Sequence, residues 1–156
     1  MPRKFKPIPE QKFPREQKIL NGTNCLAFAL GIKKIRRKKG KYSLEKTEEP
    51  IEITFLKKVK ELGFNPRDFK KISSKEEEET PGYIIRVYGF KEKRTRDNKT
   101  IYDFHVIRRE PNGKWVHKPG FFYPPKKLEN MDWYAINLIY GNKYVSFAVK
   151  SKKGRN

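Results

Sequence analysis

The chain has 156 residues, and its 38 lysines and arginines outnumber 18 aspartates and glutamates to give a net charge of +20. No run of about 18 apolar residues is present, so the sequence predicts no transmembrane helix. The N-terminus lacks the apolar run of a signal peptide, so we expect a protein of the cytoplasm or of a virus or phage particle. The single cysteine excludes an internal disulfide and a cysteine-rich zinc site.

The positive charge predicts attraction to polyanions such as nucleic acid, anionic lipid or an anionic cell-wall polymer. Compositional bias in a lysine-rich proteome gives the same charge, and the sequence leaves both interpretations open. The densest basic segment is a candidate polyanion-binding patch or a solvated basic loop. It consists of Lys33, Lys34, Arg36, Arg37, Lys38, Lys39 and Lys41.

Three parts of the chain differ in composition. Residues 1–20 carry several prolines among basic residues, and because proline lacks a backbone donor this segment is expected to be a basic extended arm. The arm either lies on the domain or reaches a partner, such as a component of a particle or complex. Residues 21–150 form the expected domain, and residues 151–156 form a basic tail.

The only cysteine follows a turn-forming segment, Asn21–Asn24 (NGTN). Asn24 or Thr23 is the expected N-cap of a short apolar helix that ends near Gly31. Cys25 would then lie in the first helical turn, where unpaired backbone N–H groups and the helix dipole favour a thiolate. We therefore expect a lowered pKa for this thiol.

Further along the chain, the apolar period changes from helical to strand-like. Apolar residues recur at helical spacing over residues 50–62, Asn65–Pro66 indicates a further short helical turn, and the acidic run 76–79 is expected to be a solvated loop. Strands are expected at 83–90, 102–109 and 114–117, and residues 134–140 and 143–150 are expected to form one or two closing strands. The predicted fold class is α+β, with N-terminal helices packed on an antiparallel β-sheet.

The loop Glu110–Lys114 (EPNGK) sets the register of the expected hairpin. Pro111 suits the second position of a type I turn and Asn112 the third. Gly113 then supplies the left-handed residue of a three-residue hairpin loop, which places Glu110 opposite Lys114.

In that register the only two histidines of the chain share a face of the sheet. Ile107 lies opposite His117, and side chains alternate, so His105 and His117 are diagonal neighbours roughly 6–8 Å apart at the backbone. A two-residue turn at positions 112–113 would shift the register by one and put them on opposite faces, and Pro111 favours the first arrangement.

One cysteine and two histidines that share a face of the sheet are the residue types of a thiol-based catalytic site. His105 would be the base for Cys25, and His117 would orient the imidazole of His105. Two other interpretations are open. The histidines are ordinary strand residues beside an inert buried cysteine, or the three side chains bind zinc, for which no fourth ligand is evident.

Three motifs resemble a group of bacterial and virus-encoded proteins. They are residues 24–30 (NCLAFAL), 103–105 (DFH) and 113–120 (GKWVHKPG). The group resembles papain-fold thiol hydrolases close to the NlpC-type cell-wall peptidases. This chain has Leu26 and Phe28 where the group usually has tyrosines.

The resemblance implies a papain-like cysteine peptidase or amidase without a cofactor or metal, acting on an amide bond, for example in a cell-wall peptide. Cys25 would be the nucleophile, His105 the base and His117 the orienting residue. Asn21 or Asn24 would add an oxyanion donor, and Tyr102 and Asp103 would flank the cleft. The alternatives are a non-catalytic basic component of a virus or phage particle on the same fold, or a nonspecific nucleic-acid-binding protein.

Overall fold

The chain is described here by a computed structural model, for residues 2–9, 13, 24–32, 39–119 and 123–150. The described part is an α+β domain, which confirms the predicted class, and none of its helices is long and apolar enough to cross a membrane. Its elements are α1 (Cys25–Ala29), the 3-10 helix η3 (Lys39–Tyr42), α2 (Ile51–Glu61), the 3-10 helix η4 (Pro66–Asp68), β1 (Phe69–Ile72), β2 (Ile84–Arg94), β3 (Thr100–Arg109), β4 (Trp115–His117), β5 (Lys126–Lys127), α3 (Asn130–Tyr140) and β6 (Tyr144–Val149).

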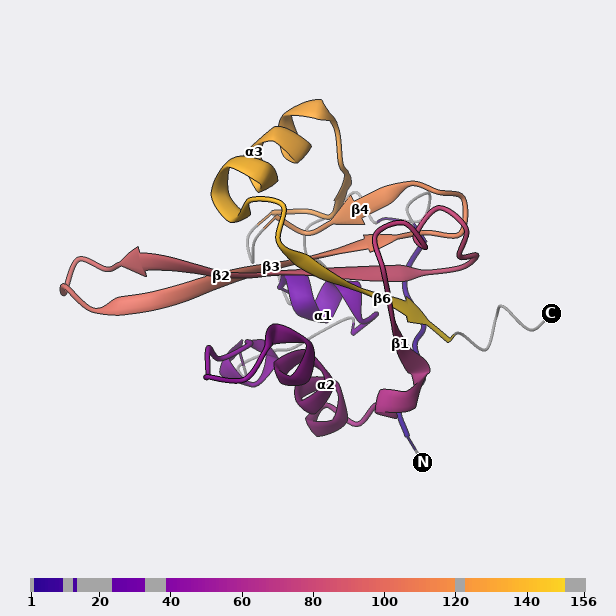
Figure 1. Cartoon of the computed structure of the whole chain (residues 1–156), viewed down its shortest axis with the longest axis horizontal. Coiled ribbons are helices and arrows are strands. Elements are labelled where there is room, and N and C mark those ends of the chain that lie inside the picture. Colours follow the sequence, from indigo (N-terminus) through magenta and orange to yellow (C-terminus); the bar gives the residue numbers. More distant parts are fainter. Residues whose placement is uncertain (1, 10–12, 14–23, 33–38, 120–122, 151–156) are drawn as a thin grey trace.

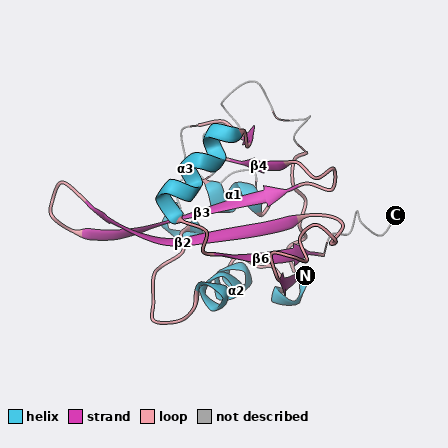
Figure 2. Ribbon diagram, turned by 45° about the horizontal axis from the view of Figure 1, so that its top comes forward, coloured by secondary structure: helices cyan, strands magenta, loops and turns pink. Residues whose placement is uncertain are grey.

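One antiparallel sheet, with strand order β1-β6-β2-β3-β4-β5, separates the helices into two groups. Helices α1 and α2 cover one face, and α3 covers the other (Figures 1 and 2). Adjacent residues of β2 show the alternation, because Val87 belongs to the core under α1 and α2, whereas Tyr88 belongs to the smaller core under α3. The molecule therefore has two cores, one on each face.

The predicted N-terminal helices are confirmed. Asn24 is the N-cap of α1, and its side-chain oxygen accepts a hydrogen bond from the backbone N–H of Ala27 at 2.8 Å. Gly31 follows with a φ of +79°, and a Cβ there would lie 2.8 Å from the carbonyl carbon of Lys6, so only glycine fits. In α2 the predicted apolar stripe is buried, with Phe55 and Val59 fully inaccessible.

Residues 2–9 of the predicted arm lie against the domain. The N–H of Arg3 donates to the carbonyl of Gly63 at 2.6 Å, and the buried Phe5 ring packs edge-on against Tyr83 with centroids 5.1 Å apart. Toward the end of this segment, the guanidinium of Arg108 donates to the carbonyl of Ile8 at 2.7 Å. This part therefore belongs to the folded body, while most of residues 10–20 and the tail 151–156 lie outside the described residues.

The predicted strand over residues 134–140 is wrong, because this segment belongs to helix α3. Its aromatic and β-branched composition is typical of strands, but Trp133, Ile136 and Tyr140 recur at helical spacing and face the sheet. Asp132 caps the first turn, and Gly141 ends the helix with a φ of +70°. The predicted strand at 143–150 is confirmed as β6, whereas the short strands β1 and β5 were not predicted.

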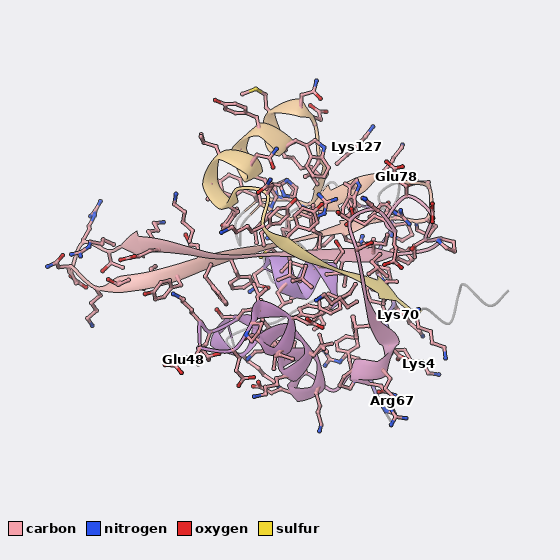
Figure 3. The ribbon with its side chains drawn as sticks, viewed as in Figure 1. Lys4, Glu48, Arg67, Lys70, Glu78 and Lys127 are labelled. Atoms are coloured by element: carbon pink, nitrogen blue, oxygen red, sulfur yellow. The ribbon has the colours of Figure 1, made fainter. Side chains whose placement is uncertain are left out.

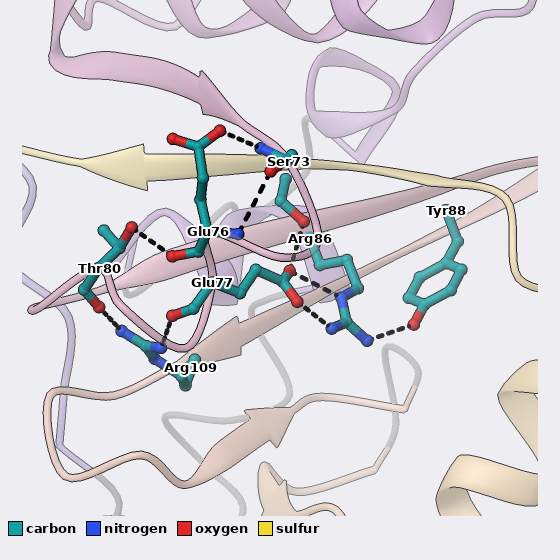
Figure 4. Close-up of polar contacts among 8 residues, drawn as sticks. Ser73, Glu76, Glu77, Thr80, Arg86, Tyr88 and Arg109 are labelled. Atoms are coloured by element: carbon teal, nitrogen blue, oxygen red, sulfur yellow. Dashed lines mark hydrogen bonds and ion pairs between the residues drawn. The ribbon is translucent and has the colours of Figure 1, made fainter.

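The acidic run 76–79 is not a simple solvated loop. Glu77 is 6% exposed, and its carboxylate accepts hydrogen bonds from Arg86 on β2 at 2.5 and 3.2 Å and from the hydroxyl of Ser146 on β6 (Figure 4). Arg109 on β3 donates to the backbone carbonyls of Glu77 and Thr80. The loop is thus fastened to the sheet by buried charge-assisted hydrogen bonds.

We expect Glu77→Ala to lower the free energy of unfolding by about 3–5 kcal/mol, because it leaves the guanidinium of Arg86 buried without its partner. Urea unfolding measures the loss. The matched control is Glu79→Ala in the same run, whose exposed side chain should matter by less than about 0.5 kcal/mol. Equal effects of the two substitutions would contradict this account.

Candidate functional site

The hairpin between β3 and β4 has the predicted register. The N–H of Gly113 donates to the carbonyl of Glu110 at 2.9 Å, and the N–H of Glu110 donates to the carbonyl of Lys114 at 2.8 Å. Gly113 has a φ of +88°, as its place in a three-residue loop requires. Arg108 pairs with Val116 and Arg109 with Trp115, so the alternative two-residue turn is excluded.

The two histidines consequently share the face of the sheet under α3, as predicted. Nε2 of His105 lies 2.8 Å from Nδ1 of His117, and the rings are nearly perpendicular at 81°. Both side chains are buried, with exposures of 7% and 5%. The ring of Tyr140 on α3 stacks on His105 with centroids 6.0 Å apart, so it closes the pair from above the sheet.

Burial keeps both imidazoles neutral. Desolvation lowers the pKa of His105 to about 3, and the charge of His117 acts in the same direction. Desolvation lowers the pKa of His117 to about 4, against the attraction of Asp132 and together with the repulsion of Lys126. At neutral pH the 2.8 Å contact therefore holds one shared proton, donated by one ring and accepted by the other.

Cys25 lies at the first position of α1 and is half-buried. Burial raises the pKa of its thiol to about 11, while the backbone N–H groups of Val106, Leu26 and Cys25 and the charge of Lys118 act to lower it. The predicted lowering of the thiol pKa at the helix N-terminus is therefore wrong in this conformation, because desolvation outweighs the backbone donors.

The thiol and the His105 ring approach β3 from different sides. Helix α1 packs on the face opposite α3, and the backbone of Val106, the residue that follows His105, acts to lower the pKa of the Cys25 thiol. Within the described part of the chain, no hydrogen bond joins the Cys25 thiol to the His105 ring. The pairing of these two groups during catalysis stays a prediction.

Three residues at this site were not predicted as site residues. Asp132 Oδ1 lies 3.9 Å from Nε2 of His117 and 2.8 Å from Nζ of Lys126. Lys118, next to His117, is fully buried near Cys25, and desolvation lowers its pKa to about 8. Tyr140 lies in the segment predicted as a strand, which is the end of α3. Glu129 and Asp132 are three residues apart before an apolar run, which is the spacing of a capping box. This spacing is the sequence signal for helix α3, whose first turn contains the acidic residue of the site.

The other residues predicted for the site do not contact the histidine pair through any described hydrogen bond. The amide of Asn24 donates to the carbonyl of Tyr42 at 2.8 Å while its oxygen caps α1, so its contacts are structural. Asp103 shares the side of β3 that bears His105 by alternation, whereas Tyr102 faces the other side, where Nζ of Lys46 lies 4.4 Å from its ring centroid. Asn21 lies outside the described residues.

The predicted basic patch also falls mostly outside the described residues, and among its members only Lys41 has a described side chain, which is exposed. Other charged side chains are spread around the domain. Figure 3 shows Lys127 beside α3, and Lys4, Arg67 and Lys70 at the end of the molecule near β1.

No group of three or more His, Cys, Asp or Glu side chains in the described ranges has an arrangement that could hold a metal ion. No family model, curated protein or solved structure matches the chain. The resemblance to papain-like hydrolases therefore stays a hypothesis that depends on the three motifs and on the site geometry.

The buried histidines should make the domain sensitive to acid. Their folded-state pKa values lie below the unfolded value of about 6.5, so their contribution to stability is complete above that pH. It is lost as the pH falls toward 4, by about 1.4 kcal/mol per pH unit for each imidazole. Proton NMR of the two histidine rings, with urea unfolding from pH 7 to pH 4, measures both effects. A titration midpoint near 6.5 for either ring would contradict the buried neutral pair.

Proposed function

We propose that this protein is a cysteine-dependent hydrolase of amide bonds, with Cys25 as nucleophile and His105 as base. The observation that carries the proposal is the buried contact between Nε2 of His105 and Nδ1 of His117 at 2.8 Å, one residue along β3 from Val106, whose backbone acts to lower the pKa of the Cys25 thiol. A second buried histidine that fixes the ring of the first is what a thiol-activating base needs.

The proposed reaction uses the ring nitrogen of His105 that does not contact His117. With Nε2 of His105 directed at His117, Nδ1 is left to accept the proton of the Cys25 thiol. The sulfur attacks the amide carbonyl carbon, the tetrahedral intermediate collapses to a thioester, and Nδ1–H of His105 protonates the departing amine. Water, deprotonated by His105, then hydrolyses the thioester and restores the thiol. The resemblance makes a peptide amide, such as one in a cell-wall peptide, the first substrate class to test.

The electrostatics require that the site be solvated before it reacts. The thiol pKa is raised by desolvation, which entering water or substrate relieves, while the stabilising groups are fixed in the fold. They are the N–H groups of Val106, Leu26 and Cys25 and the charge of Lys118.

A second function is favoured by one specific observation. A thiol with a pKa of about 11 stays protonated at neutral pH, and imidazoles with pKa values of about 3 and 4 stay neutral, as in a site without catalysis. The domain would then be a basic, non-catalytic component of a particle, built on the same α+β scaffold, with its net charge of +20 directed at a polyanion.

The rate of alkylation of Cys25 by iodoacetamide, measured from pH 5 to pH 11, distinguishes the two functions. A hydrolase should react well below pH 8.5, with a rate that falls at least about tenfold in His105→Ala. The chain has one cysteine, so the signal comes from Cys25 alone.

The control is Tyr123→Ala, which removes an aromatic ring that is 64% exposed and should leave the rate unchanged. Reaction only above about pH 10, or only after unfolding, would contradict the hydrolase and support the non-catalytic component.

A further inference from the structure

We propose that Asp132, held by Lys126, is a positioning residue that sets the tautomers of both histidines and so leaves Nδ1 of His105 as the unprotonated, basic nitrogen that a base for Cys25 requires. The inference deepens the proposed hydrolase function and depends on it for its catalytic meaning. The arrangement of protons that it predicts is a property of the folded chain and can be measured without substrate.

The two oxygens of the Asp132 carboxylate have separate tasks. Oδ2 accepts a hydrogen bond from the N–H of Glu129 at 2.8 Å and so caps the first turn of α3. Oδ1 faces the site, 2.8 Å from Nζ of Lys126 and 3.9 Å from Nε2 of His117. Burial acts to raise the pKa of Asp132, but the hydrogen bonds from Lys126 and from the N–H of Glu129 outweigh it and lower the pKa, so the carboxylate is charged at neutral pH.

Nε2 of His117 is a buried polar atom without a hydrogen-bond partner among the described residues. A neutral imidazole carries its proton on one of two nitrogens, and a carboxylate accepts hydrogen bonds but cannot donate them. The negative charge of Asp132 therefore favours the proton on Nε2 of His117, at the nitrogen nearer to the carboxylate. This leaves Nδ1 of His117 as an acceptor.

The second tautomer follows from the first. Because Nδ1 of His117 accepts, the 2.8 Å contact requires that Nε2 of His105 carry the proton. Nδ1 of His105 then has a free lone pair, which is the state in which a histidine can take a proton from a thiol. With the opposite tautomers, Nδ1 of His105 would carry a hydrogen and His105 would be unable to act as the base from that nitrogen.

A purely structural role of Asp132, as the cap of α3, is the competing explanation. Asp132→Asn distinguishes the capping role from the tautomer-setting role. Asparagine keeps an oxygen that can accept from the N–H of Glu129 but has no negative charge to favour the Nε2–H tautomer of His117. Asp132→Glu does the reverse, since it keeps the charge and alters the cap geometry. Asp97→Asn, an exposed acid at the tip of the β2–β3 hairpin, is the matched control for the loss of one charge.

The experiment is long-range proton–nitrogen NMR of the histidine rings in full-length ¹⁵N-labelled protein at neutral pH, prepared without a histidine tag. Two histidines give two ring spin systems, and the ¹⁵N shifts distinguish protonated from unprotonated nitrogens. We expect Nε2–H tautomers for both rings in the unmodified chain, in Asp97→Asn and in Asp132→Glu. In Asp132→Asn the ratio of Nε2–H to Nδ1–H forms should fall about tenfold for both rings, because a charged partner has been replaced by a neutral one.

The inference would be overturned if the tautomer ratios in Asp132→Asn equalled those of the unmodified chain. It would also be overturned if His105 carried its proton on Nδ1 in the unmodified chain. Lys126→Gln provides a second measurement that does not touch the cap. Removal of its charge should raise the pKa of His117, which Lys126 now lowers, and an unchanged titration would count against the proposed network.

The same variants also separate this inference from the hydrolase proposal. If Cys25 is unreactive toward iodoacetamide but the tautomers depend on Asp132, the positioning network stands and the hydrolase fails. If Cys25 reacts with the expected dependence on His105 but the tautomers ignore Asp132, the hydrolase stands and the network fails. If both hold, the alkylation rate below pH 8.5 should fall about tenfold in Asp132→Asn and not in Asp97→Asn.

Discussion

The register of the β3–β4 hairpin is the constraint on which the candidate site depends. The three-residue loop after Glu110 places His105 and His117 on one face, and a shift of one residue would move His117 to the other face, under α1. The 2.8 Å contact between the rings fixes where α3 can lie, because Tyr140 stacks on one histidine and Asp132 faces the other. A local turn thus sets a long-range arrangement of side chains from three elements.

Both faces of the sheet bury polar groups, and each group is fixed by partners from distant parts of the chain. Under α3, Glu77 joins the loop before β2 to Arg86 and to Ser146 on β6. On the other face the fully buried guanidinium of Arg108 donates to the carbonyls of Phe28 and Ile8, and desolvation lowers its pKa to about 10. Since an unpartnered buried charge is costly, these contacts specify how α1 and the N-terminal segment dock on β3, and so where Cys25 lies.

The features of the fold that the sequence predicts correctly are those determined by residues close together in the chain. The cap at Asn24, the apolar stripe of α2 and the turn at Gly113 each follow from residues close together in the chain. The failures depend on tertiary context. Helix α3 is apolar on its exposed side as well, with Leu138 69% exposed, so its helical period was masked by strand-like composition. The burial of Glu77 depends on Arg86 and Ser146, which no local pattern reveals.

Which groups of the site carry protons depends more on desolvation by burial than on the neighbouring charges. Desolvation is the largest cause of the shifts at Cys25, His105 and His117, and in each case it favours the neutral form. Because burial raises the pKa of the Cys25 thiol and lowers the pKa of the His105 imidazole, proton transfer from the thiol to the ring is unfavourable in this conformation. Chemistry at Cys25 therefore requires water or substrate to enter beside the sulfur, and the fixed backbone donors and Lys118 become effective stabilisers of the thiolate once the desolvation penalty falls. Access to the site, more than the identity of its residues, is then the property that separates a hydrolase from an inert scaffold with the same three side chains.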